Sequence, residues 1–411
     1  MALKIGCGWK LSIVRTDPFP LLLFEIAAPS AIKRNPMNII KTIILNSLLV
    51  ALPLTATAQL GTWSTNVANV PLSHADGAAA VLNGKIYSMG GGDYGCNTFT
   101  NLHVYNYTNN IWTTLLGMPT RRYEFGAAEL NGLIYAIGGN PGCGTAAGLT
   151  IVEAYDPVSN TWSNKASLPT GGYGAGVASA NGKIYFIGGS LNPATVYAYN
   201  PTNNSWSTKA SFPTNNTFCG VAVVNSIIYV IGGALAGASA NVYAYNPVTD
   251  AWTAKAPMPT GRYDPAVGVI GGIIYVAGGV TTGGQRPRAV EAYNPQTDSW
   301  STNTPLPFPV VGASGGAVNG KLYVIGGYDT NNATLATVEV FTPAPAGPAL
   351  TIATVGTQSV LFWPASATNY VLESTTNLSS PNWQTASDAV PVIAVVVSNQ
   401  LPARYFRLKG P

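Results

Sequence analysis

One short phrase recurs six times along this chain: an aliphatic residue, a tyrosine, two further residues and then two consecutive glycines. The glycine pairs begin at residues 90, 138, 188, 232, 278 and 326, so the interval is 44 to 50 residues. Self-similarity at such a period indicates a repeat architecture, in which each copy is one supersecondary unit that stacks against its neighbours. The period therefore limits the fold far more tightly than it limits the chemistry.

Each copy has the pattern of four short β-strands. A tight turn such as Asn83-Gly84 precedes the repeated tyrosine, and it predicts a hairpin because both central residues of a type I′ turn need positive φ. A third strand follows, such as residues 152–155, and is usually ended by a proline, which cannot continue a ladder. A fourth strand carries a tryptophan, such as Trp162. Six such units predict an all-β, six-bladed propeller.

The sixth copy lacks one strand. Its third strand carries Phe341, but no tryptophan follows. A matching segment stands before the first copy, where residues 61–64 resemble residues 160–163. We expect the segment around Trp63 to supply the outer strand of the sixth blade and so to close the ring. The outer strands then carry Trp63, Trp112, Trp162, Trp206, Trp252 and Trp300.

Strand alternation sorts the connections onto two faces. The turns between strands one and two must lie on one face. The loops between strands two and three, and those from strand four to the next strand one, must lie on the other, which we call the loop face. Its loops are longer and unequal, for example 92–101 and 280–288. Variable loops on a rigid scaffold are where binding usually occurs.

The six glycine pairs and the periodic aromatic residues resemble the kelch family over about residues 59–345. The resemblance implies a six-bladed kelch-type β-propeller of the secreted bacterial type. It also implies a docking place, because kelch proteins that bind partners typically bind them at the mouth of the channel on the loop face. We expect the repeated tyrosines, tryptophans and glycines to be scaffold, since aromatic side chains bury large areas and glycines allow close backbone approach.

Polar side chains of the strand-four-to-one loops should converge around the channel mouth. Arginines and an asparagine occur thirteen residues before the repeated tyrosine, and further tyrosines follow one residue later. Arginines, tyrosines and amides suit a polar or anionic ligand, so we predict a protein or glycan partner. The predicted ligand-binding residues are Arg122, Tyr123, Tyr173, Asn216, Arg262, Tyr263, Asp264, Arg286 and Arg288.

A carbohydrate-active enzyme is the alternative function. A secreted copper radical oxidase uses a kelch-type propeller, but it needs histidine, tyrosine and cysteine ligands around one metal. This chain has only His74 and His103, and His103 falls in a third strand. A sialic-acid epimerase or mutarotase needs an acid and a base near an arginine clamp, and Glu124, Asp264 and Arg262 could take those roles. No motif spacing supports this, so we predict no catalytic residues, metal or cofactor and favour a non-enzymatic binding protein.

The first 58 residues resemble an export segment. Residues 37–58 combine a basic start, a short apolar run and a small-x-small ending, Ala56-Thr57-Ala58, which predicts a secretory signal peptide. A retained signal anchor is the alternative. Because Met37 begins this segment, we interpret residues 1–36 as an extension from a mis-started reading frame. A chain cleaved before Gln59 would keep no integral membrane span, and we expect it to be secreted, periplasmic or cell-surface.

Charge supplies no argument for a nucleic-acid partner. The formal net charge is +4, but residues 1–58 hold six of the basic and two of the acidic residues. The remainder has 14 of each and is neutral, so a strong field that would attract nucleic acid or anionic membrane is not expected. We expect the chain to be a monomer.

Two further segments follow the propeller, which we predict to span residues 59–342. Residues 343–348 are a Pro/Ala-rich linker of the semi-rigid type. Residues 349–411 contain several short strand patterns separated by turn signals, which predicts a small β-sandwich. This part resembles the short β modules that end many large secreted bacterial proteins.

The cysteines fit an exported chain. Cys96 and Cys143 each follow a glycine pair, in the strand-two-to-three loops of adjacent blades. We predict a Cys96–Cys143 disulfide, which export would permit and which would add about 4 kcal/mol in the chain-entropy model. Two free thiols are the alternative. Cys219 begins an inner strand and should be a buried, small apolar residue.

Overall fold

The computed structural model describes residues 60–142, 148–234 and 237–344 in full, and elsewhere the backbone of ten strands. The chain divides into two compact units. One is Leu60–Pro343, and the other combines Met1–Gln59 with Ala344–Pro411. No described residue is helical, which confirms the all-β prediction.

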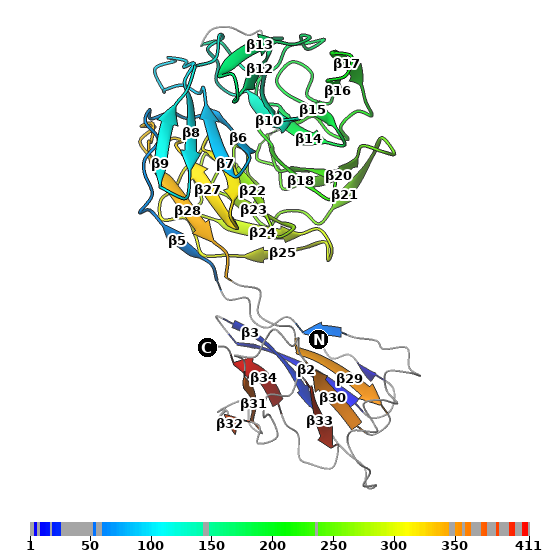
Figure 1. Ribbon diagram of the computed structural model, residues 1–411. Helices are drawn as coiled ribbons and strands as arrows, with labels where there is room; N and C mark the ends of the chain where they lie inside the picture. Colours follow the sequence, from blue (N-terminus) through cyan, green and yellow to red (C-terminus); the bar gives the residue numbers. More distant parts are fainter. Residues whose placement is uncertain are drawn as a thin grey trace. The chain divides into compact units, whose positions relative to one another are not determined.

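The larger unit is a propeller of four-stranded antiparallel blades (Figure 1). The first blade contains β6 (Ala78–Leu82), β7 (Lys85–Met89), β8 (Leu102–Asn106) and β9 (Ile111–Thr114). The second contains β10 (Gly126–Leu130), β11 (Leu133–Ile137), β12 (Val152–Asp156) and β13 (Thr161–Asn164). The third contains β14 (Gly176–Ala180), β15 (Lys183–Ile187), β16 (Val196–Asn200) and β17 (Ser205–Thr208).

Three further blades complete the ring. The fourth contains β18 (Gly220–Val224), β19 (Ile227–Ile231), β20 (Val242–Asn246) and β21 (Ala251–Lys255). The fifth contains β22 (Ala266–Ile270), β23 (Ile273–Ala277), β24 (Val290–Asn294) and β25 (Ser299–Thr302). The sixth contains β26 (Ser314–Val318), β27 (Lys321–Ile325), β28 (Val338–Thr342) and the N-terminal β5 (Thr62–Ser64). The first strand of each blade packs against those of both neighbouring blades, so these strands surround a central channel.

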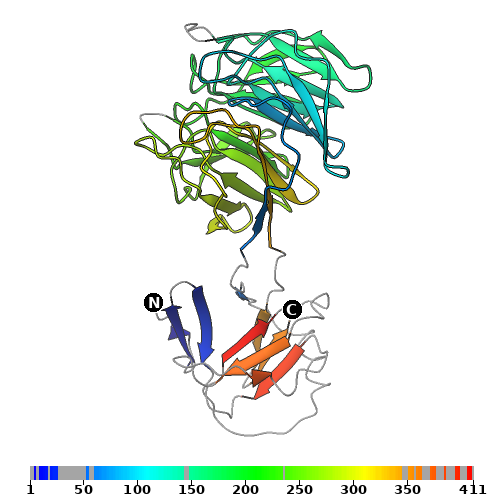
Figure 2. The same cartoon turned by 90° about the vertical axis from the view of Figure 1, so that its left-hand side faces the viewer.

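The ring closes as the sequence predicts. Strand β5 pairs antiparallel with β28, and Trp63 lies directly opposite Phe341. Both ends of the propeller therefore meet in one blade, as the neighbouring blue and orange strands in Figure 2 show. This pairing covers an edge of β28 that would otherwise stay open.

The second unit is described by strand backbones alone. Its strands are β1 (Lys4–Ile5), β2 (Trp9–Thr16), β3 (Phe19–Glu25), β4 (Leu52–Leu54), β29 (Leu350–Val355), β30 (Gln358–Phe362), β31 (Val371–Thr375), β32 (Gln384–Thr385), β33 (Ala394–Ser398) and β34 (Tyr405–Lys409). They form sheets in the orders β1-β2-β3, β33-β30-β29-β4 and β32-β31-β34. Strand β4, which pairs with β29, falls within the predicted signal peptide, most of which lies outside the described residues. The signal peptide and the C-terminal sandwich remain predictions.

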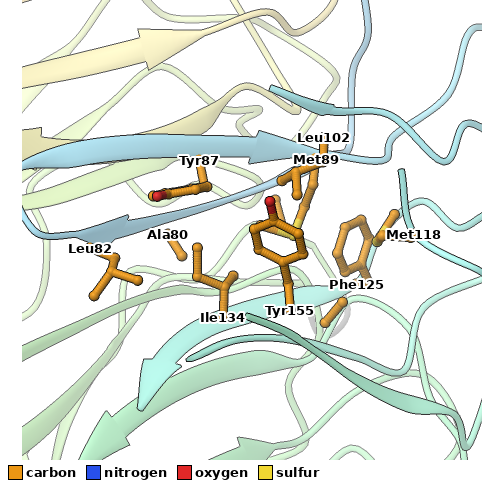
Figure 3. Close-up of a cluster of buried hydrophobic side chains, with 11 residues drawn as sticks. Ala80, Leu82, Tyr87, Met89, Leu102, Met118, Phe125, Ile134 and Tyr155 are labelled. Carbon is orange, nitrogen blue, oxygen red and sulfur yellow. The ribbon is translucent and has the colours of Figure 1, made fainter. Parts of the chain in front are cut away.

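Aromatic side chains fill the space between blades. Between the first and second blades, Tyr87 and Met89 face Phe125, Ile134 and Tyr155 (Figure 3). Within each blade, the aromatic residue of the third strand lies directly opposite the tryptophan of the outer strand. The ring centroids of these pairs are 4.8 to 5.2 Å apart. Such pairs add about 0.5–1.5 kcal/mol beyond the area that they bury.

A hydrogen-bonded clasp joins each blade to the connector that precedes it. In the third blade, the Nε1 of Trp206 donates to the carbonyl of Ala166 at 2.8 Å. The amide of Ala166 donates to the Oδ1 of Asn204 at 2.8 Å, and the Tyr199 hydroxyl donates to the same oxygen. The connector residues Ala68, Leu116, Ala210 and Ala256 are held in the same way by other blades.

The residue whose side-chain oxygen accepts hydrogen bonds in this clasp is always Asn or Asp, and its backbone conformation explains why. These residues have φ between 49° and 56°, in the left-handed region, which Asn and Asp tolerate better than most side chains do. In the sixth blade Phe341 has no hydroxyl, and Trp63 donates to the carbonyl of Thr304 at 2.9 Å. The clasp therefore explains why the tryptophans and the following polar residues recur.

The glycine pairs join the blades nearer the loop face. The amide of Gly139 donates to the carbonyl of Gly172 in the next blade at 2.8 Å, and the other five pairs make the equivalent bond at 2.8 to 3.1 Å. A Cβ on Gly138 would lie 2.7 Å from that carbonyl oxygen. Both glycines also have positive φ. The repeated glycines are scaffold because a side chain would force the blades apart.

We predict that Asn204→Ala lowers the free energy of unfolding by about 2–3 kcal/mol. The change removes two hydrogen bonds, each worth about 1 kcal/mol, and leaves alanine in the left-handed region at a further cost of about 1 kcal/mol. Urea unfolding of the purified chain measures the effect. The matched control is Asn203→Ala at the adjacent exposed position, which should change stability by less than about 0.5 kcal/mol. Equal effects of the two substitutions would contradict the clasp.

Candidate functional site

A cavity of about 190 Å³ occupies the channel. It is lined where each strand-four-to-one loop enters an inner strand, so it lies at the loop-face end. The carboxylic acids Asp76, Glu124 and Asp264 line it, together with Ser314 and Cys219. Lysine, arginine and histidine are absent from its lining. The rest of the lining is glycine, alanine, valine, phenylalanine and proline.

The three acids occupy equivalent places in their blades. Each lies eleven residues before the repeated tyrosine, and we call these places the hub positions. They are Asp76, Glu124, Gly174, Phe218, Asp264 and Gly312. Backbone hydrogen bonds of 2.6 to 2.8 Å link neighbouring hub positions: Glu124 donates to Asp76, Gly174 to Glu124, Phe218 to Gly174, Asp264 to Phe218 and Asp76 to Gly312. This chain of bonds fixes where the hub side chains begin.

All six hub positions have a left-handed backbone, with φ between 50° and 64°. Glycine adopts this conformation without strain, as it does in blades three and six. Glu124 and Phe218 adopt it at a cost of about 1–2 kcal/mol each. Strain of this kind concentrates at functional sites.

The two hub glycines also make room for their neighbours. A Cβ on Gly312 would collide with the carboxyl of Asp76, and one on Gly174 would collide with the ring of Phe218. The Asp76 side chain therefore leans over blade six, between its own blade and the blade that carries Asp264. This arrangement brings carboxyls from blades one, two and five around one cavity.

Burial raises the pKa of all three carboxyls. It raises the pKa of Asp76 from 3.8 to about 7, although the Tyr328 hydroxyl, which donates to Asp76, lowers the pKa. Burial and then the charge of Asp76 raise the pKa of Glu124 to about 8. The pKa of Asp264 is raised by burial and then by the charges of Asp76 and Glu124. The three groups therefore repel one another when ionised.

Aromatic side chains surround this acidic centre. The ring of Phe218 lies 6.4 Å from the rings of both Tyr173 and Tyr263. On another side, Tyr94 packs edge-on against Tyr328 at 6.2 Å, and Tyr94 is 70% exposed. The loop face thus presents aromatic rings around a cavity lined by acids.

The predicted arginines do not reach this cavity. Arg122 is fully buried and pairs with Glu153, with the Nη2 and Oε2 atoms 2.6 Å apart. Its Nη1 also donates to the carbonyls of Gly138 and Ile151. Arg262 pairs with Glu291 in the same way at 2.9 Å. Both guanidinium groups lie inside their blades, and we no longer propose them as ligand contacts.

The other predicted residues divide between structure and surface. Asn216 is buried, and its Nδ2 donates to the carbonyl of Gly232. Arg286 bonds the carbonyl of Asp329 and the side chain of Asn332, and Arg288 bonds the carbonyl of Leu306. These two arginines tie loops together. Tyr123, Tyr173 and Tyr263 each stand one residue before a hub position, and Asp264 occupies one; that these residues bind a ligand remains a prediction.

Sequence reasoning did not select Asp76 and Glu124 as part of the ligand-binding set. The available signal was that both acids stand two residues before the start of an inner strand, and that Glu124 directly follows the predicted Tyr123. Most of the predicted ligand-binding residues stand thirteen or twelve places before the repeated tyrosine, whereas the hub residues that line the cavity stand eleven places before it.

The structure bears on the cysteines and on possible metal ligands only within the residues that it describes. Cys96 is disulfide-bonded. Its predicted partner Cys143 falls outside the described residues, so the pairing remains a prediction. Cys219 is a free thiol in the cavity wall, and burial raises its pKa to about 12. Across residues 60–142, 148–234 and 237–344, no group of three or more histidine, cysteine, aspartate or glutamate side chains could hold a metal ion.

Comparison with known proteins agrees with this architecture. The family model described as the kelch motif matches residues 74–119, 121–169, 171–213, 216–259, 261–307 and 309–344, which is more than half of the chain. The chain belongs to the kelch-repeat family. This kelch propeller is also similar to a solved structure titled "Structure of YjhT", with a TM-score of 0.58 and 17% sequence identity. The likeness covers 70% of this chain and 97% of that one, and it concerns the fold.

No curated protein sequence matches this kelch chain significantly. Within the part that the structure describes, no helix is long and apolar enough to cross a membrane.

The raised pKa values make this kelch propeller lose stability as pH rises. Between about pH 4 and pH 8, the folded chain holds protons on Asp76 and Glu124 that the unfolded chain has released. Stability must fall with pH wherever the folded state binds more protons. We predict that the triple variant Asp76→Asn, Glu124→Gln, Asp264→Asn matches the wild type in melting temperature at pH 4 and exceeds it at pH 9. Parallel curves for the two proteins across this range would contradict the prediction.

Removing a buried arginine should affect folding. We predict that Arg122→Ala lowers the free energy of unfolding by about 3–5 kcal/mol, because Glu153 is left buried without its partner. The control is Arg121→Ala, at the exposed neighbouring position, which should cost less than about 0.5 kcal/mol. Guanidinium unfolding monitored by tryptophan fluorescence measures both. A near-neutral Arg122→Ala variant would show that the ion pair has no structural role.

Proposed function

We propose that this kelch propeller is a binding protein whose ligand site is the cavity at the hub. The observation that carries the proposal is the convergence of Asp76, Glu124 and Asp264 on one cavity at the loop face. Native proteins rarely place three mutually repelling carboxyls together unless a ligand or a reaction uses them. Four hub positions also carry side chains where glycine would be unstrained.

The location of the protein, the class of its partner and the role of its C-terminal module are also part of this proposal. We infer an exported protein, secreted, periplasmic or held at the cell surface, on the basis of the signal-like residues 37–58. The partner is a protein or a glycan, which the loop face contacts while the repeated aromatics hold the ring rigid. The C-terminal module 349–411 is proposed as a second unit with an adhesion or spacing role.

A carbohydrate-active enzyme is the second candidate. The observation in its favour is that burial gives Asp76 and Glu124 pKa values of about 7 and 8, close to those that general acid–base catalysis requires. An epimerase or mutarotase would use two of the hub carboxyls as acid and base. The arginine clamp that we expected for this chemistry is not available, because Arg262 is bound to Glu291.

Arrays of peptides and glycans test the proposal. We expect the wild-type chain to capture ligands that the triple hub variant, Asp76→Asn with Glu124→Gln and Asp264→Asn, binds at least tenfold more weakly. Lys85→Ala is the control, because Lys85 is exposed at the start of β7, next to the strand-one-to-two turn on the opposite face. Capture that survives in the triple variant would place the ligand elsewhere.

The same material separates binding from catalysis. Captured glycans are incubated with the wild type and with Glu124→Gln and then analysed for altered products. Unaltered glycans support a binding protein. Turnover that falls at least a hundredfold in Glu124→Gln supports the enzyme instead.

A further inference from the structure

We infer that the hub cavity receives the ammonium group of a lysine side chain presented by a partner protein. This inference deepens the proposed function and rests on it. It differs from the anionic ligand that the arginines suggested, because those arginines are inside the blades.

The charge of the cavity is the first argument. Asp76, Glu124 and Asp264 carry up to three negative charges, and no basic side chain lines the same space. Arg122 and Arg262, which stand two residues before hub positions, each bind a glutamate of their own. A cation that enters the cavity would relieve the mutual repulsion of the carboxyls, whereas an anion would increase it.

Ser314 supplies an independent observation. Ser314 is one of the residues that line the cavity, it is only 7% exposed, and its Oγ has no hydrogen-bond partner. Buried hydroxyls are normally paired, and leaving one unpaired costs about 1–3 kcal/mol. The equivalent residues of the other blades are Ala78, Gly126, Gly176, Gly220 and Ala266, so the strand itself does not need a hydroxyl here. An ammonium group has three N–H donors, which could bond carboxylates and this oxygen together.

The remaining lining selects among cations. A bare metal ion is disfavoured, because no group of acidic, histidine or cysteine side chains among the described residues is arranged to hold one. Apart from its acids, Ser314 and Cys219, the cavity is lined by apolar residues and glycine, including Phe125 and Phe218. This wall suits a slender methylene stem and would leave the hydroxyls of an amino sugar without partners. Lysine combines such a stem with a compact charge.

The pH dependence of binding follows from the groups that face the cavity. The three hub carboxyls are the central groups. Around them lie the thiol of Cys219 and four tyrosine hydroxyls, those of Tyr123, Tyr173, Tyr263 and Tyr328. Asp93 lies further out. His74 is buried beside the first blade and is bonded to Leu72 and Ser88. Among these groups, Asp76 and Glu124 titrate between pH 6 and pH 9. A lysine stays charged there, so binding must tighten as the carboxyls lose their protons.

Calorimetric titration of the full chain tests this inference. The probe is the capped peptide Gly-Gly-Lys-Gly-Gly, and its partner is the same peptide with an Nε-acetylated lysine. We expect the free lysine peptide to bind at least tenfold more tightly at pH 8.5 than at pH 6, with uptake of the peptide accompanied by proton release. The acetylated peptide should not bind.

Two variants locate the contact. Ser314→Ala should weaken binding of the lysine peptide three- to tenfold without lowering the melting temperature, and the control Ser301→Ala, in an exposed part of β25, should leave it unchanged. Glu124→Gly, which copies blades three and six, should weaken binding at least tenfold while keeping or raising the melting temperature. The melting temperatures therefore distinguish the loss of a contact from weak binding by a variant that has unfolded.

Other outcomes overturn the inference. They are equal binding of the acetylated and free peptides, tighter binding at pH 6, or binding of glucosamine or calcium without binding of the lysine peptide. In each of these cases the proposed function stands if the array ligands still depend on the hub acids. Loss of that dependence would overturn both.

Discussion

The clasp between each blade and the preceding connector is the interaction on which the rest of this propeller depends. One connector residue, such as Ala166, is held through both its amide and its carbonyl by Asn204 and Trp206 of the next blade. The connector is also the segment that leads to the hub. Its anchoring at the rim and the glycine-pair bonds nearer the channel together fix where the hub backbone lies. Without them the three carboxyls would have no defined separation.

The sequence predicted the scaffold well because the scaffold repeats. The tyrosine–glycine-glycine copies, the tryptophans and the closing strand at Trp63 all obey local rules of turn, strand and aromatic packing, and each was visible several times. The site was predicted less well. Arg122 and Arg262 seemed exposed because charged side chains usually are, and their buried partners Glu153 and Glu291 lie about thirty residues away on other strands. No periodic pattern signals a partner of that kind.

At the hub, the side chains that the proposed ligand site needs are not those that stability favours. Blades three and six show that glycine suits its backbone, yet blades one, two and five carry acids that repel one another and are difficult to ionise. The buried arginine pairs of blades two and five are arranged differently, because each charge there has a partner and several carbonyl acceptors. Within one fold, one loop position therefore serves cohesion, and the hub position beside it serves ligand contact in the function that we propose.

The closure of blade six has a consequence for how this chain matures. Trp63 and Phe341 lie at opposite ends of the propeller sequence, so the strand pairing to which they belong is the most non-local in the ring. During synthesis β5, which is the first strand of the propeller, must stay unpaired until the sixth blade has been made. Contacts of such long range slow folding because a large loop must close before they form. Until then the open edges of β28 and β5 can pair with another copy, so a single late strand pairing decides between a closed monomer and a swapped assembly.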